Sequence, residues 1–398
     1  MPHDVALIET VAIGLSLAFL AGFAAVRVRL PPLVGYLLAG VAVGPFTAGF
    51  VADATLAPQL AEIGVILLMF GVGMHFSIRD LWAVRRLAIP GAIGQIAVAT
   101  ALGAGVASLW GWPLEAGLMF GLALSVASTV VLLRALEDRG LVHSADGRIA
   151  VGWLIVEDLV MVLALVLLPA LSGAAAPHGG HATPPGGVWG ALGLTLGKVA
   201  AFVVLMLVVG GRVFPWLLKR VEKTGSRELF TLAVVALSLG VAFGSAELFG
   251  VSLALGAFFA GMVVHESDLS HRAANELQPL QDVFGALFFV SVGMVFDPSV
   301  LVREPIHVLA VIGIIVIGKS IAAFGIVRAL RGSLATALTV SAALAQIGEF
   351  SFILVALGIG LGLLPAESRS LVVAGALLSI TLNPLVFEVV GRWTPRPD

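Results

Sequence analysis

Apolar stretches long enough to cross a bilayer recur along almost the whole chain. A membrane-spanning helix needs about 20 mostly apolar residues. On that rule we predict thirteen spans, at roughly 5–26, 32–50, 56–75, 87–110, 114–136, 148–172, 193–218, 228–247, 250–264, 279–297, 306–328, 335–360 and 368–391. The first span follows Asp4, contains Glu9 and lacks the basic start of a signal peptide, so we expect it to be retained. The predicted fold class is therefore an all-α polytopic membrane protein.

The composition supports this prediction and excludes several other classes of protein. Only 12% of the 398 residues are charged and 59% are hydrophobic, whereas a soluble domain carries about 25% charged residues. A net charge of -2 gives no reason to expect a nucleic-acid partner, and the lack of cysteine excludes disulfides, thiol catalysis and cysteine-ligated metals. The chain has neither an H-E-x-x-H helix nor a G-x-S-x-G elbow. We therefore expect a lipid-embedded protein that is not an enzyme and holds no cofactor or metal centre.

The basic residues predict an orientation. If the N-terminus lies outside, eighteen of the 22 lysines and arginines fall in cytoplasmic loops, and only Arg303 and Arg369 fall in outer loops. The other two, Lys198 and Lys319, lie within spans. This bias follows the positive-inside rule for an odd number of spans, with the N-terminus outside and the C-terminus in the cytoplasm.

Charged and polar side chains lie near the predicted middle of three spans. They are Glu157 and Asp158 in 148–172, Lys319 in 306–328, and Gln346, Glu349 and Ser351 in 335–360. Glu157 and Asp158 are about 15 Å into a core roughly 30 Å thick, at 1.5 Å per helical residue. Ionisable residues at this depth are costly and usually serve a function. The alternative is a buried ion pair that only holds helices together, although such pairs contribute little net stability.

This cluster predicts competition between a cation and a proton. Neighbouring helical residues point about 100° apart, so Glu157 and Asp158 cannot both face one partner. We expect Glu157 to pair with Lys319 and Asp158 to face a water-filled path, as the main ion and proton carrier. Buried groups this close influence one another's protonation. If only loaded states cross the membrane, competition for the same oxygens produces antiport.

Two of the spans also read as interrupted helices. The span 114–136 carries Ser125, Ser128 and Thr129 at mid-depth, and 335–360 contains AQIGEFS with Gly348. The last span carries Asn383-Pro384. Freed carbonyls and half-helix ends in such stretches can coordinate cations, and paired interruptions in two halves are typical of inverted-repeat transporters. Small and hydroxyl residues are also common in ordinary helix packing, so both interpretations stay open here.

At the level of motifs, the chain resembles a known family. The matching stretches are PPLVGYLLAGVAVGP (31–45), IGVILLMFGVGMHFS (63–77), LSVASTVVLLRALEDRG (124–140), GWLIVEDLVMVLALVLLPAL (152–171), LALGAFFAGMVV (253–264), LFFVSVGMVFDP (287–298) and ALAQIGEFSFIL (343–354). They are similar to the membrane domain of the second family of monovalent cation:proton antiporters, close to Kef-type potassium/proton antiporters and their YbaL-like relatives. The resemblance covers nearly the whole chain.

The resemblance implies a fold and a mechanism. It implies the thirteen-helix inverted-repeat antiporter fold, a homodimer in a bacterial inner membrane, and broken, crossing helices at 114–136 and 335–360. Within the single domain 1–398, the ranges 87–172 and 306–391 would form an ion-translocating core that moves like an elevator. The ranges 5–86 and 228–297 would form the dimer scaffold, and 193–218 would link the two.

The resemblance also implies roles for residues. Asp158 would carry the ion and the proton, with oxygens from Ser125, Ser128 and Thr129 nearby. The preceding residue is Asp in related electrogenic sodium/proton exchangers and Gln in some Kef proteins, but it is Glu157 here. This departure leaves ion selectivity and stoichiometry open.

Several alternatives follow from the same residues. We expect exchange of K+, and less readily Na+, for H+. A sodium-coupled symporter of the same fold is the alternative, followed by a cation channel, although a midplane lysine opposes cation flow through a pore. Full-length Kef-type proteins usually continue into a cytoplasmic nucleotide-binding domain, but no G-x-G-x-x-G unit occurs here. We expect any such regulatory domain to lie outside these 398 residues.

Overall fold

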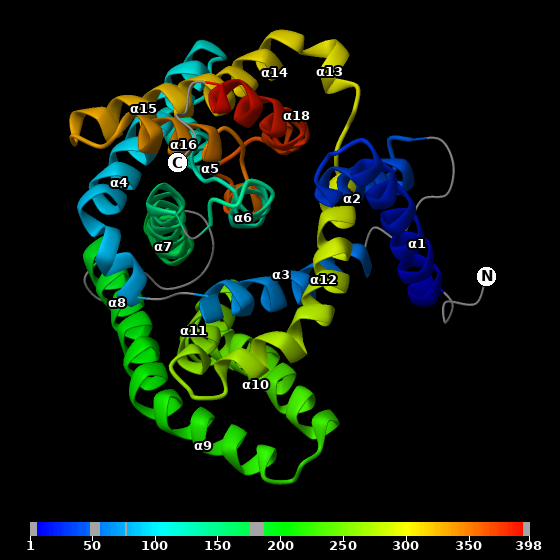
Figure 1. Ribbon diagram of the computed structural model, residues 1–398, viewed down its shortest axis with the longest axis vertical. Coiled ribbons are helices and arrows are strands. Elements are labelled where there is room, and N and C mark those ends of the chain that lie inside the picture. The colour runs from blue at the N-terminus through cyan, green and yellow to red at the C-terminus, as the bar shows by residue number, and fades with distance from the viewer. Residues whose placement is uncertain (1–5, 48–55, 76–77, 143, 176–186, 393–398) are drawn as a thin grey trace. The chain divides into compact units, whose positions relative to one another are not determined.

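A computed structural model describes residues 6–47, 56–75, 78–142, 144–175 and 187–392. All regular structure in these ranges is helical (Figure 1). The elements are α1 (Ala6–Arg27), α2 (Pro32–Val43), α3 (Leu56–His75), α4 (Ile78–Leu109), α5 (Leu114–Ser125), α6 (Thr129–Glu137), α7 (Ala145–Ala175), α8 (Gly187–Leu205), α9 (Gly211–Glu222), α10 (Arg227–Phe249), α11 (Leu253–His265), α12 (Ser270–Met294), α13 (Val300–Arg303), α14 (Pro305–Ile312), α15 (Lys319–Ala329), α16 (Leu334–Ala343), α17 (Glu349–Gly360) and α18 (Glu367–Gly391), with π-helical η2 (Met206–Gly210) and η3 (Gly313–Gly318).

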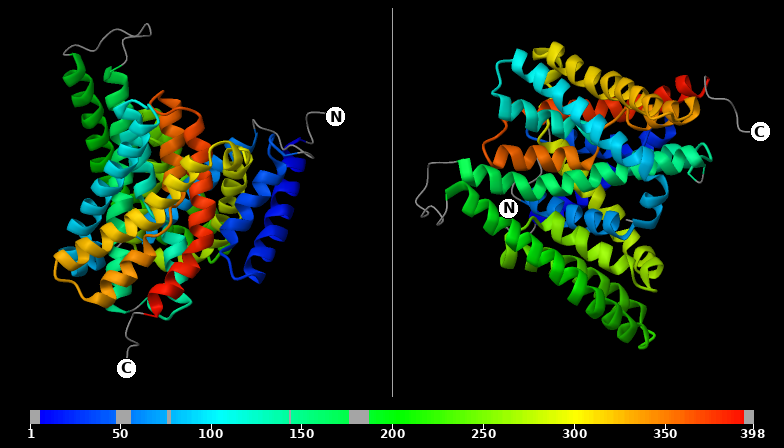
Figure 2. Two further views of the ribbon diagram at one scale, coloured as in Figure 1. Left: turned by 90° about the horizontal axis from the view of Figure 1, so that it is seen from above. Right: turned by 90° about the vertical axis from the view of Figure 1, so that its left-hand side faces the viewer.

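The predicted spans all have helical counterparts. Among the described residues, 10 helical segments are long and apolar enough to cross a membrane, and α2, α11, α16 and α17 are shorter apolar helices. The predicted span 335–360 corresponds to α16 and α17 together. The span 306–328 corresponds to α14, η3 and α15, which Figure 2 shows as one continuous rod coloured yellow to orange.

Three predicted boundaries were wrong, each for a local reason. The span 32–50 gives a helix only to Val43, because Gly44 is extended and Pro45 follows it. The spans 87–110 and 279–297 begin earlier, at Ile78 and Ser270. Their added turns contain too many polar and charged residues to be recognised by hydropathy.

The chain forms two compact units. One contains the segments Met1–Ser16, Ala52–Phe76 and Val162–Ser291, and the other contains Leu17–Val51, Ser77–Met161 and Val292–Asp398. In the first unit α3 packs along α11, and Gln281 donates to the carbonyl of Leu67 at 2.8 Å. The second unit holds all the residues predicted for the ion site. The division into a scaffold and a moving core stays a prediction.

Two helix breaks meet in the second unit. The first break separates α5 from α6, with Val126 and Ser128 extended. The second separates α16 from α17, with Gly348 extended. A Cβ atom on Gly348 would come closer than 3.0 Å to the backbone nitrogen and Cα of Ser128. Glycine at this position therefore allows the two interrupted segments to cross backbone against backbone.

This close approach predicts the effect of one added methyl group. Gly348→Ala should lower the free energy of unfolding by about 1–3 kcal/mol, because the rigid backbone of Ser128 cannot yield as a flexible side chain would. Gly360→Ala is the matched control, since nothing lies within 4 Å of its added Cβ. Thermal unfolding of the purified variants in detergent measures both. Equal melting temperatures for the two variants would contradict the crossing.

Candidate ion site at the crossing of two broken helices

Side chains from the opposite break and from neighbouring helices bind the backbone groups that the two breaks leave open. Gln346 accepts a hydrogen bond from the Ser128 amide at 2.9 Å, and its Nε2 donates to the Ser128 carbonyl at 3.1 Å. Glu157 on α7 accepts from the Ala127 amide through Oε2 at 2.9 Å. Within the first break, the Ser128 hydroxyl accepts from the Val131 amide at 3.3 Å and caps α6. Because lipid offers no hydrogen bonds, a break within a membrane requires such partners.

The polar groups match the dipoles of the four helix ends. The N-termini of α6 and α17 meet at the crossing and favour negative charge. Glu157 binds the amide of Ala127, just before α6, and Glu349 is the first residue of α17. The C-terminal ends of α5 and α16 favour donors or positive charge instead. Near these ends, Gln95 donates to the Ser125 carbonyl at 3.1 Å, and Lys319 donates to the Gln346 carbonyl at 2.9 Å.

Asp158 accepts a hydrogen bond from a side-chain hydroxyl, whereas Glu157 accepts one from a backbone amide of the first break. Asp158 Oδ2 accepts from the Thr129 hydroxyl at 3.2 Å, whereas its Oδ1 is buried and has no hydrogen-bond partner among the described residues. Only 3% of the residue is exposed. Glu349, equally buried, accepts from the Ser128 hydroxyl at 3.2 Å. The crossing therefore collects three buried carboxylates around residues 127–129.

Lys319 lies at the same crossing as Glu157, and the pairing of these two groups stays a prediction. Both side chains are fully buried and interact through their charges, yet no ion pair within 4.0 Å joins them among the described residues. Glu157 uses one oxygen for Ala127, and Lys319 points its ammonium at a carbonyl of the opposite break. Each charged group is bound by a backbone group, and the two charges also act on each other.

Several buried oxygens at this site remain without protein partners. In the described part of the chain they include Glu157 Oε1, Asp158 Oδ1, Gln95 Oε1 and Ser351 Oγ. Ser125, by contrast, donates its hydroxyl to its own helix, at the carbonyl of Leu122, 2.7 Å away. Buried polar atoms without partners are rare in proteins and call for water, a proton or an ion. These oxygens are therefore the groups available to a cation or a proton.

The sequence predictions missed two buried amides. Gln95 lies on α4 and is fully buried, and its role at the end of α5 could be suspected only from a lone glutamine in an apolar stretch. Asn383 was noted for its proline neighbour alone. In the structure its Nδ2 donates to the Ala342 carbonyl at 2.8 Å, which satisfies a backbone group near the end of α16.

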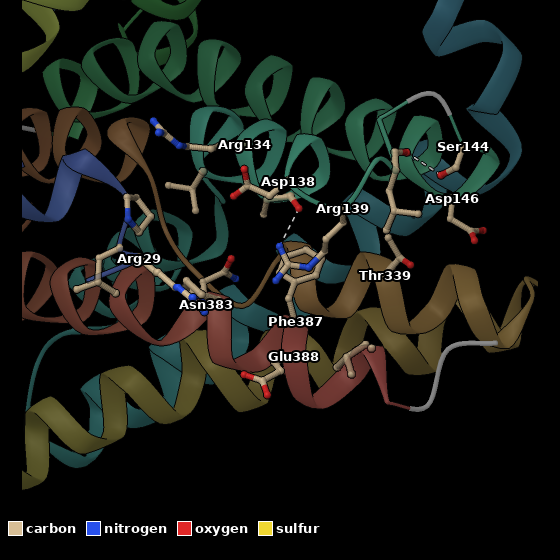
Figure 3. A pocket seen from close by; sticks show the side chains of 18 of the residues that line it. Arg29, Arg134, Asp138, Arg139, Ser144, Asp146, Thr339, Asn383, Phe387 and Glu388 are labelled. Carbon is tan, nitrogen blue, oxygen red and sulfur yellow. Dashed lines mark hydrogen bonds between the residues drawn. The ribbon is translucent and has the colours of Figure 1, made fainter. Parts of the chain in front are cut away.

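A cavity of about 1120 Å³ lies beside the crossing in the same unit. It extends from Val131 on α6 and Thr339 on α16 to Asn383 and Phe387 on α18 (Figure 3). Val131 lies two residues after Thr129, the last of the polar residues at the first break. Burial lowers the pKa of the Arg139 guanidinium at this cavity, and the nearby Asp138 carboxylate opposes that shift.

The fold and the site together define a polytopic helical membrane transporter with two crossed, broken helices. The chain belongs to the sodium/hydrogen exchanger family, whose transmembrane region matches residues 15–393. It is therefore a membrane cation/proton antiporter and not an enzyme, and the predicted family is confirmed.

Individual relatives agree with this assignment. The chain is 59% identical over its full length to the putative cation/proton antiporter YbaL of Escherichia coli, of which it covers 71%. It is 33% identical to K(+) efflux antiporter 4 of Arabidopsis thaliana, over 97% of this chain and 64% of that protein. The sodium proton antiporter MjNhaP1 of Methanocaldococcus jannaschii has the same fold, with a TM-score of 0.70 at 16% identity over 97% of this chain and 98% of that one. This likeness confirms the predicted fold class.

The bonds of Gln346 predict a large effect of its removal. Gln346→Leu should lower the free energy of unfolding by about 1–3 kcal/mol, since it leaves the buried amide of Ser128 without its partner, while the Ser128 carbonyl keeps its bond from the Leu132 amide. Gln278→Leu is the control, because that glutamine is exposed and bonds only to Asp282. Chemical denaturation of both variants in detergent provides the comparison. A Gln346 variant as stable as the control would show that the amide does not hold the crossing.

Proposed function

We propose that the protein exchanges a monovalent cation, K+ in preference to Na+, for H+ at Asp158. The observation that carries this proposal is the Asp158 carboxylate: it is buried, one of its oxygens has no partner among the described residues, and its other oxygen binds a hydroxyl, whereas Glu157 binds the backbone of a break. A buried oxygen in that condition needs a proton or a cation. The Thr129 hydroxyl supplies a neighbouring oxygen, and Ser128 lies one residue earlier in the break.

Glu157 and Lys319 have a different role in this proposal. Their bonds to the backbone of the two breaks hold the frame in which Asp158 works. Their charges partly balance each other and tune the neighbouring carboxylate. Gln346 and Glu349 stabilise the same crossing through Ser128, and Ser351 adds an unpartnered oxygen beside them.

Support for K+ comes from relatives. Two plant proteins named as K(+) efflux antiporters, 4 and 6, are 33% and 32% identical to this chain over 97% of its length. Transport then follows by alternating access, in which the core carrying the crossing moves against a scaffold shared by two copies. We place the protein in a bacterial inner membrane with the N-terminus outside, as the distribution of basic residues indicates.

The proposal predicts the loss of exchange when Asp158 loses its charge. In proteoliposomes that carry a pH gradient, addition of K+ should drive proton flux through the wild type, with smaller responses to Na+ and Li+. Asp158→Asn should abolish this flux while the protein stays folded, since an amide is nearly the same size but cannot take up and release a proton. A pH-sensitive dye in the vesicles measures the rates.

Asp282→Asn is the matched control for this experiment. Asp282 is exposed, bonds to Gln278 on α12 and belongs to the unit that does not contain the crossing. This variant should exchange ions at the wild-type rate. K+-driven proton flux that persists in Asp158→Asn would refute Asp158 as the carrier, and a strictly Na+-driven flux would refute the preference for K+.

If Glu157 and Lys319 together hold the crossing, the effects of their substitutions on stability should be coupled. Lys319→Gln leaves the Glu157 charge buried without its balancing neighbour, so the single variant should be strongly destabilised and its exchange should show a changed pH profile. In Glu157→Gln/Lys319→Gln both charges are removed, so part of that loss should be restored. A double-mutant cycle should give a coupling of about 1–3 kcal/mol. Additive losses together with an unchanged pH profile would contradict the pairing of these two groups.

A further inference from the structure

The cavity beside the crossing carries a set of charged side chains that the ion site does not use. They are Arg29, Arg134, Asp138, Arg139, Asp146 and Glu388. Figure 3 shows Arg139, which follows α6, reaching toward Phe387 of α18, whereas the side chain of Arg134 extends away from α18 in this view. By formal charge the set is neutral. Its acids and bases, however, are not paired with one another.

Two of the three carboxylates are already engaged elsewhere. Asp146 accepts a hydrogen bond from the Thr336 hydroxyl at 2.5 Å. Glu388 pairs with Arg392 one helical turn further along, at 3.2 Å. The Thr336 hydroxyl carries no charge, so Asp138 and Asp146 both remain to balance the arginines of the cavity, whereas Glu388 is neutralised by Arg392.

In the described part of the chain, the arginines of the cavity make few hydrogen bonds and ion pairs. Among the described residues, the side chains of Arg29 and Arg134 make no hydrogen bond and no ion pair. Arg139 donates one bond, to the Ala135 carbonyl at 2.9 Å, and lies over the Phe387 ring at 4.5 Å from its centroid. A guanidinium carries five N–H donors, so most donors of these three side chains are unused. With Glu388 paired to Arg392, which is outside the set, the three arginines exceed Asp138 and Asp146 by one charge and keep most of their donors unused.

We propose that this cavity binds an anion that carries a phosphate group. Guanidinium groups bind phosphate oxygens through paired hydrogen bonds, and three of them around one space favour a group with several charged oxygens. The volume of about 1120 Å³ suits a lipid headgroup or a small soluble phosphate ester. Phe387 offers an apolar surface that holds Arg139 in place beside the ligand. Both sources present the same chemistry, and the experiment separates them.

The backbone at Arg29 allows a clean test of this proposal. Arg29 has φ 62°, in the left-handed region that favours glycine, and it follows the C-terminal end of α1. Arg331 has φ 63° and follows α15 in the same way, but it does not line the cavity. Arg29→Gly and Arg331→Gly therefore relieve the same backbone strain and remove the same charge. Only the first removes a guanidinium from the cavity.

The experiment uses two probes on the purified full chain. In neutral phosphatidylcholine nanodiscs, inorganic pyrophosphate is titrated at constant ionic strength and the melting temperature is followed, with chloride as the reference anion. In a second arm, native mass spectrometry compares retention of phosphatidylglycerol with that of phosphatidylcholine. Wild type should bind at least one phosphate probe. Arg29→Gly and Arg134→Gln should weaken that binding roughly tenfold, the loss expected for a charged hydrogen bond, whereas Arg331→Gly should match the wild type.

Each outcome decides the matter. Pyrophosphate binding that is lost in the two cavity variants supports the site and assigns it to a soluble phosphate ester. Phosphatidylglycerol retention lost in the same variants supports it and assigns it to a lipid headgroup. The proposal is overturned if neither probe binds better than its reference, or if Arg331→Gly weakens binding as much as Arg29→Gly. None of these readouts depends on cation transport, so the result stands apart from the proposed exchange reaction.

Discussion

The hydrogen bonds of four helix ends inside a membrane are the constraint on which this structure depends. Each break leaves amides and carbonyls that lipid cannot satisfy, at a cost of several kcal/mol per group. The Gln346 side chain bonds to both the amide and the carbonyl of Ser128, and Glu157 accepts a hydrogen bond from the amide of Ala127. Gln95 and Lys319 donate hydrogen bonds to carbonyls near the C-terminal ends of α5 and α16. Donors and cations stand at the C-terminal ends and carboxylates at the N-terminal ends, as the helix dipole requires. The polar residues of the crossing are thus as much a consequence of the broken backbone as of the transported ion.

This constraint also separates the roles of two adjacent acids. Glu157 and Asp158 point in different directions from α7, so only one of them can reach the amide of Ala127. Glu157 accepts a hydrogen bond from the backbone of the first break. A change in its charge would therefore disturb the fold. Asp158 meets a hydroxyl, which can either donate or accept and so tolerates a change of protonation. We therefore infer that α7 carries two adjacent acids with different tasks. Glu157 holds the backbone of the crossing, and Asp158 binds the exchanged ion or proton.

The sequence predicted the spans and the polar residues well because both depend on local composition. Thirteen apolar stretches and a few mid-depth charges are visible without knowing any contact. The polar starts of α4 and α12 were missed because hydropathy detects only the lipid-facing part of a helix. The function of Gln95 was missed because its partner, the carbonyl of Ser125, exists as an open group only once α5 ends there. The pairing of Glu157 with Lys319 was expected from their opposite charges at a similar depth. The backbone groups that hold each side chain are not visible in a sequence.

Charge balance at the crossing explains why such a site should exchange one ion for another and not simply release it. Glu157, Asp158 and Glu349 are buried beside one buried lysine, Lys319. If all four were ionised, the cluster would hold two negative charges in excess, and uncompensated charge in a low-dielectric interior is costly. A bound cation or a bound proton lowers that excess by the same amount. A site emptied of both carries the largest excess, so it is the state least able to cross the membrane interior. Replacement of the cation by the proton keeps the charge of the site constant. The electrostatic cost that makes buried acids rare in membranes would then couple the flux of the cation to the flux of protons.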